Sequence, residues 1–253
     1  MTLQDQHVAR RAGTATPPPA PTPPPAVDGG PRPGSDRTTA RVVGVLYLAG
    51  MVLGIGSNLL IQSVLTAPGG LSRIATSGTL LGVGAVLWLA TVAGDAAHGV
   101  LMFGVLRRSG GRTAVGYLTA RILDAVLIAV MVLLIVVQVP LGREYLASGP
   151  AGAASLESVS RVLTEANLSA YALGMTAVGV AGLLLCRGFL RARLIPRPLA
   201  WWGLVGYAIL LGGSVLEILG LHLHAVHAIP GGLWELFIGG WLIVKGFHRD
   251  PAA

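Results

Sequence analysis

Residues 114–138 read AVGYLTARILDAVLIAVMVLLIVVQ, an apolar stretch that contains two charged side chains, Arg121 and Asp124. At about 1.5 Å per residue, a helix of this length crosses a hydrocarbon core of about 30 Å. The stretch therefore predicts a membrane-spanning helix. Because an ionisable group at bilayer depth is costly, the two charges inside it are the first candidates for a functional site.

Five further apolar segments of similar character lie on either side of this stretch. The chain of 253 residues is 53% hydrophobic and only 11% charged, whereas a soluble domain typically carries about 25% charged residues. We therefore predict an all-α fold, a polytopic membrane bundle of six transmembrane helices within residues 38–248. The last helix is the shortest and is expected to stand upright. The expected spans are residues 42–65, 80–106, 114–138, 168–186, 199–221 and 228–244.

The two ends of the chain lie outside this predicted bundle. Residues 1–37 are rich in proline, which predicts a disordered, semi-extended arm. A solvated tether is favoured for this arm over a segment that docks onto a partner. Residues 249–253 form a short tail.

Basic residues alternate between the two sides of the predicted bundle. Fourteen Arg and Lys residues lie in the N-terminal arm, in the loops after the second and fourth helices, and in the tail, whereas the alternate loops hold only Arg73, Arg143 and Arg161. This is the positive-inside pattern, so we expect a multi-pass protein of the cell membrane with both termini cytoplasmic. It also explains the net charge of +7 without nucleic acid as a partner.

Several short motifs resemble a known family. They are Arg41-Val42-Val43-Gly44 at the first helix, Leu194-Ile195-Pro196-Arg197-Pro198 before the fifth, and Pro230-Gly231-Gly232-Leu233-Trp234-Glu235 in the sixth. Together they resemble a bacterial family of six-helix membrane proteins catalogued as domain of unknown function 4386, over about residues 38–248. The resemblance implies the same topology, and it implies no catalytic residue.

Five ionisable side chains within the spans are expected to form an intramembrane polar cluster. Counted from the cytoplasmic ends of their helices, Asp95, Asp124 and Glu235 lie about 14–17 Å deep, near the middle of the bilayer. His98 and Arg121 lie slightly nearer the cytoplasm. Because the second and third helices are joined by a short loop, Arg121 should pair with Asp95 across the helices and with Asp124 on its own helix.

Two interpretations of this cluster remain open. It is either a set of ion pairs that fixes helix register, or the lining of a polar cavity that binds a ligand or passes a proton. Three carboxylates against one Arg leave an excess of acid, unless some carboxyls are protonated, His98 is charged or a cation binds. Asn58 and Gln62, four residues apart on the first helix, are candidates to line the same interior.

A second group of candidates lies at the outer side, between the fifth and sixth helices. Histidine and glutamate are chemically suitable ligands for zinc, but their spacing here matches no zinc motif. Histidines on the surface of a loop are therefore the favoured interpretation. The residues are Glu217, His222, His224 and His227.

Three functions are compatible with these patterns. The first is a small transport or ligand-binding protein that uses the polar cluster. The second is an intramembrane enzyme, with or without a metal, that acts on a lipid-like substrate. The third is a structural or regulatory partner that binds through the Pro-rich arm. A function other than catalysis is favoured, and no cofactor is predicted. The expected partners are the lipid bilayer and a small-molecule or lipid ligand, while the oligomeric state stays open.

Overall fold

The computed structural model describes residues 33–221, 223 and 226–248, and every regular element among them is helical. Within this part of the chain, six helical segments are long and apolar enough to cross a membrane. The predicted all-α membrane fold is thereby confirmed, and the chain is a multi-pass membrane protein. The elements are α1 (Pro33–Leu65), α2 (Gly70–Thr76), α3 (Gly78–Leu106), η1 (Arg107–Ser109), α4 (Gly111–Val136), α5 (Gln138–Ala147), α6 (Gly149–Ala192), α7 (Arg197–Ile218), η2 (Val226–Ala228) and α8 (Ile229–Val244).

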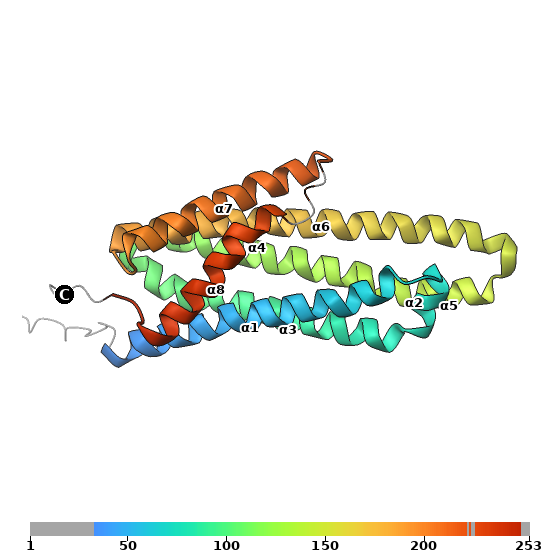
Figure 1. The fold of residues 1–253 in the computed structure, drawn as a ribbon, viewed down its shortest axis with the longest axis horizontal. Coiled ribbons are helices and arrows are strands. Elements are labelled where there is room, and N and C mark those ends of the chain that lie inside the picture. Colours follow the sequence, from blue (N-terminus) through green and yellow to red (C-terminus); the bar gives the residue numbers. More distant parts are fainter. Residues whose placement is uncertain (1–32, 222, 224–225, 249–253) are drawn as a thin grey trace, which may run out of the picture. The chain divides into compact units, whose positions relative to one another are not determined.

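The six long helices, labelled in Figure 1, form a ring by their order of contact. Going around it, α1 packs on α3, α3 on α4, α4 on α6, α6 on α7 and α7 on α8, and α8 returns to α1. Large apolar side chains on the outer faces of these helices are exposed, as lipid-facing residues of a membrane bundle are. The inner faces are thereby left to pack on one another and to enclose a polar interior.

The last helix closes this ring at an angle, which corrects the expectation that it stands upright. In Figure 1, α8 crosses the other helices obliquely, with its start beside α7 and its end beside α1. Glycines permit both contacts. A Cβ atom on Gly206 would lie 3.1 Å from the Cα atom of Gly231, and one on Gly44 would lie 2.5 Å from the carbonyl oxygen of Gly239. Backbones can approach this closely only where side chains are absent.

The connections at the end opposite the predicted cytoplasmic side contain more helix than the sequence suggested. α6 begins at Gly149 rather than near Leu168, and its 44 residues span about 66 Å, roughly twice the thickness of a hydrocarbon core. The short helix α5 runs alongside this extension, and α2 packs on α5. Buried Gln138 joins α5 to α6, because its amide donates to Thr164 and accepts from Ser160.

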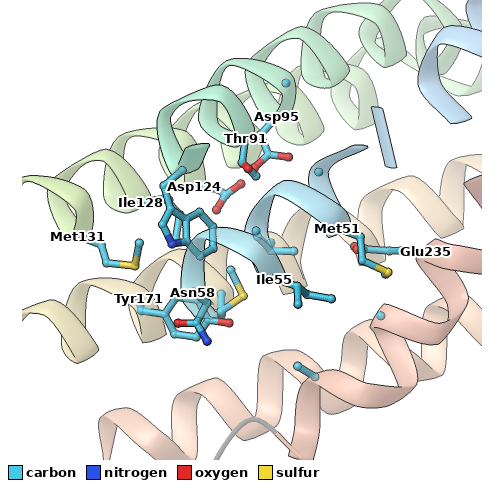
Figure 2. Close-up of a pocket in the computed structure, with 18 of the residues that line it drawn as sticks. Met51, Ile55, Asn58, Thr91, Asp95, Asp124, Ile128, Met131, Tyr171 and Glu235 are labelled. Atoms are coloured by element: carbon cyan, nitrogen blue, oxygen red, sulfur yellow. The ribbon is translucent and has the colours of Figure 1, made fainter. Parts of the chain in front are cut away.

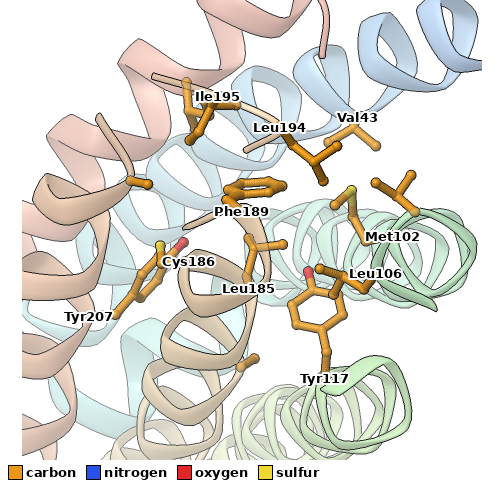
Figure 3. Close-up of a cluster of buried hydrophobic side chains, with 14 of the residues drawn as sticks. Val43, Met102, Leu106, Tyr117, Leu185, Cys186, Phe189, Leu194, Ile195 and Tyr207 are labelled. Carbon is orange, nitrogen blue, oxygen red and sulfur yellow. The ribbon is translucent and has the colours of Figure 1, made fainter. Parts of the chain in front are cut away.

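The cytoplasmic end of the predicted topology contains the larger apolar core. Figure 3 shows its side chains converging from α1, α3, α4, α6 and α7, with Met102, Leu106 and Phe189 fully buried. A second cluster, around Ile61, Leu81 and Ile128, packs α1, α3 and α4 together in the outer half. The first core closes the ring at one end, so the open interior of the ring lies between this core and the opposite end.

The predicted arm falls mostly outside the described residues, as does the tail 249–253. Residues 33–37, which were assigned to the arm, instead begin α1. Proline is favoured in the first turn of a helix because its fixed φ suits the helix and its missing N–H would have no partner there. Pro33 therefore fits the start of α1.

The glycine contact between α1 and α8 predicts opposite effects for two alanine substitutions on the same helix. Gly44→Ala should lower the melting temperature, because even one methyl group meets the backbone of α8, and overpacking costs about 1–3 kcal/mol. Gly56→Ala meets no atom within 4 Å, so it should raise the melting temperature through helix propensity, by up to about 1 kcal/mol. Thermal unfolding in detergent measures both. If both substitutions changed the melting temperature by the same amount in the same direction, the contact between Gly44 and α8 would be contradicted.

Candidate functional site

A cavity of about 540 Å³ lies inside the ring, and all six long helices contribute to its lining. Figure 2 shows part of the lining, with Asp95 and Asp124 on one side and Asn58, Tyr171 and Glu235 among the residues around it. The five residues of the predicted intramembrane cluster all line this cavity: Asp95, His98, Arg121, Asp124 and Glu235. The structure thus brings together residues from three separate parts of the chain.

Arg121 makes both contacts that the sequence predicted for it. Its Nη2 atom donates to Oδ1 of Asp95, which joins α4 to α3. Its Nη1 atom lies 3.2 Å from Oδ2 of Asp124, one turn further along α4. Gly99 of α3 makes room for this arrangement, since a Cβ there would lie 3.1 Å from the Cβ atom of Arg121. The guanidinium therefore carries a paired charge in the interface between these two helices.

Asp124 and His98 are buried polar groups with unused hydrogen-bonding capacity. The Asp124 side chain is only 1% exposed, and neither of its oxygens has a hydrogen-bond partner of suitable geometry, although it is paired electrostatically with Arg121. His98 shares one hydrogen bond of 2.6 Å between its Nδ1 atom and the Tyr117 hydroxyl, while its Nε2 atom has no partner. Both residues belong to the cavity lining, so these groups with unused hydrogen-bonding capacity are buried in its wall.

Glu235 enters the cavity from the oblique helix α8. Oε1 accepts a hydrogen bond of 2.7 Å from the hydroxyl of Tyr207 on α7. The ring of Tyr207 lies directly against Gly182 of α6, where a Cβ would come within 2.1 Å of it. Trp234, the preceding residue, is fully buried and donates through Nε1 to the carbonyl of Leu199, 2.7 Å away. These bonds fix the start of α8 and thereby the position of its carboxylate.

Sequence reasoning missed several polar side chains in the lining. Tyr47, Thr91, Asn167, Tyr171 and Tyr207 all line the cavity. Asn58 and Gln62 line the cavity as expected, and they were identified as polar side chains within an apolar span. The missed residues carry the same signal. Applied to hydroxyl and amide groups as well as charges, this criterion would have included them.

The outer histidines differ from the expectation of a surface loop. His227 is buried, because Gly213 of α7 has no side chain and the imidazole occupies that space. Its Nε2 atom lies 3.5 Å from the Ser214 hydroxyl and its Nδ1 atom 3.8 Å from Glu217. His222 and His224 lie outside the described residues. Among the residues that are described, no three His, Cys, Asp or Glu side chains gather closely enough to hold a metal ion.

The ring of apolar helices and its polar interior define a multi-pass membrane protein with a charged intramembrane cavity. The chain matches the family described as domain of unknown function (DUF4386) over residues 42–246. This match covers most of the chain, and the protein belongs to that family. No curated protein and no solved structure matches the chain.

The pairing of Arg121 predicts a distinctive pattern of stability. Arg121→Gln should lower the free energy of unfolding by about 3 kcal/mol, because it leaves two carboxylates unpaired in an apolar setting. Adding Asp95→Asn and Asp124→Asn to this variant should recover much of the loss, since the triple variant has no charge left to pair at these three positions. Thermal unfolding in detergent compares the two proteins. A triple variant less stable than Arg121→Gln alone would contradict this account.

Proposed function

We propose that the protein binds a small molecule in the ring cavity and functions as a membrane-embedded binding or transport protein. The observation that carries this proposal is the pair of buried groups with unused hydrogen-bonding capacity, Asp124 and His98, on the cavity wall. Leaving a buried polar group without a partner costs about 1–3 kcal/mol, and a ligand or water in the cavity supplies the missing partner.

The size and lining of the cavity support the same proposal. Its volume of about 540 Å³ is within the range of about 300–1,000 Å³ that is usual for small-molecule sites. Ion pairs that served only to fix helix register would need the contacts of Arg121 alone. They do not account for Glu235, which lines the same cavity from the far side of the ring and is held there by its own bond to Tyr207.

The orientation that we propose has both termini in the cytoplasm and the protein in the cell membrane. Three of the basic segments are neighbours at one end of the bundle. The Ser109 hydroxyl donates to the carbonyl of Gly188, which joins η1 to the end of α6, and the amide of His248 donates to the carbonyl of Leu194. Such a concentration of Arg and Lys at one end favours the cytoplasmic side for it.

Two leucine substitutions on α1 test the binding site. Gly54 lines the cavity and a Cβ there points toward Trp88, 3.7 Å away, whereas Gly56 is outside the lining and has open space around it. Gly54→Leu should obstruct the cavity beside Trp88 and abolish the retention of a bound molecule, and Gly56→Leu should retain it as the unmodified protein does. Native mass spectrometry of the protein released from neutral detergent micelles detects the bound mass. The same bound mass on both variants, or none on any of the three proteins, would contradict the proposal.

Cysteine labelling tests the orientation. The native thiol of Cys186 is fully buried and should give little background. In intact cells, a membrane-impermeant maleimide should label Ser155→Cys in the outer extension of α6. It should label Lys245→Cys, at the opposite end of the bundle, only after the cells are permeabilised. The reverse pattern would show that the termini face outward.

A further inference from the structure

The wall of the ring cavity is incomplete on the side where α8 joins α1. The two helices meet at Gly44 and Gly239. From this point, α1 continues for about 32 Å to Leu65, whereas α8 extends only about 15 Å back to its first residue, Ile229, and does so obliquely. The outer half of α1 therefore runs beyond the reach of α8.

Apolar side chains that line the cavity are widely exposed on this side. Ile55 and Leu59 of α1 are 58% and 66% exposed, and Leu168 of α6 is 52% exposed, although all three belong to the lining. These three residues are called the mouth below. They lie within helical segments that are long and apolar enough to cross a membrane, so the mouth belongs to the membrane-spanning part of the ring. Figure 2 shows Ile55 and Asn58 on the same helix, α1, among the residues that line the cavity.

The interior beyond the mouth suits a cation. Among the charged side chains of the lining, three are acidic and one, Arg121, is basic and already paired with two of the acids. Glu235 has one oxygen bonded to Tyr207, and its second oxygen remains as an acceptor. An anionic group would meet this excess of carboxylate without a free guanidinium to receive it.

Aromatic side chains in the lining favour a particular type of cation. Five aromatic residues border the cavity, and the faces of such rings attract ammonium groups, including quaternary ones. They line the same cavity as the carboxylates, and ammonium-binding sites combine aromatic rings with negative charge in this way. The residues are Tyr47, Trp88, Tyr117, Tyr171 and Tyr207.

We infer that the ligand is a single-chain amphiphile with an ammonium head group, which enters sideways from the bilayer through the mouth. Its head lies between the carboxylates of Asp124 and Glu235, and its chain passes Ile55, Leu59 and Leu168 into the lipid. The inference rests on the proposed binding function and adds the class of ligand and its route. A water-soluble cation would gain nothing from an apolar opening at membrane depth.

Three probes of matched chemistry test the class of ligand. Dodecyltrimethylammonium has both the head and the chain, tetramethylammonium has the head alone, and dodecyl sulfate has the chain with an anionic head. Native mass spectrometry of the full chain in neutral detergent should show tight binding of the first probe only. Asp124→Asn and Glu235→Gln should each weaken that binding by about tenfold or more, as expected for the loss of one charged contact worth about 1.4 kcal/mol. Glu235→Gln keeps an oxygen that can accept the Tyr207 hydrogen bond.

The cavity variants separate failure of this inference from failure of the proposed function. Gly54→Leu should abolish binding of dodecyltrimethylammonium, and Gly56→Leu should leave it unchanged. If tetramethylammonium bound equally well, the amphiphile would be excluded while a binding cavity remained. Preference for dodecyl sulfate would overturn the assigned charge. Loss of the natural bound mass in Gly54→Leu, without binding of any probe, would overturn the ligand class alone.

A photoreactive probe tests the route. Dodecyltrimethylammonium with a diazirine near the middle of its chain, where the chain passes the mouth, should crosslink to peptides that contain residues 55–62 of α1 or Leu168 of α6. Crosslinks concentrated instead on the buried core around Met102 and Phe189 would place the chain at the opposite end of the cavity and overturn entry through the mouth. Gly54→Leu supplies the background of unspecific labelling.

Discussion

The guanidinium of Arg121 must carry a full positive charge within a ring of apolar helices, and most of the interior is arranged around this requirement. Asp95 holds it from α3 and Asp124 from α4, so the two helices have a fixed register where they share the charge. At bilayer depth, neither carboxylate can be left alone at low cost. Two acidic side chains pair with one basic side chain, so acid is in excess, and Glu235 on α8 adds a third acid to the lining. This surplus of acid is more than a single structural ion pair requires, and it is the basis of the proposed binding function.

The oblique path of α8 leaves the cavity that contains these acids open on one side. Its glycine contacts let it cross from α7 to α1, and its 16 residues are too few to cover the outer half of α1. The core around Met102 and Phe189 closes the opposite end of the ring. The interior is therefore sealed toward one side of the membrane and open at the level of the lipid chains. Movement of a ligand to the sealed side would require the side chains shown in Figure 3 to separate.

Much of the fold followed from local sequence, and the cavity followed only in part. Apolar length identified the six helices, and the short loop before α4 was sufficient to predict that Arg121 reaches both Asp95 and Asp124. The bond from Tyr207 to Glu235 was not predictable in this way, because it depends on how two helices cross at Gly206 and Gly231. The burial of His227 depends similarly on an absent side chain at Gly213. Helical periodicity describes faces of single helices, whereas these contacts arise from crossing angles.

The helix that completes the ring is also the last of the six to leave the ribosome. Domains acquire structure from the N-terminus as synthesis proceeds, so α1 to α7 meet the bilayer before α8 exists. During that interval α8 is absent from between α1 and α7, and the interior lacks Glu235. Biogenesis thus has a vulnerable period that ends only when α8 inserts between α1 and α7. A ribosome that stalled before Ile229 would leave in the membrane a protein with its charged interior unprotected, which is the kind of defect that membrane quality control can recognise.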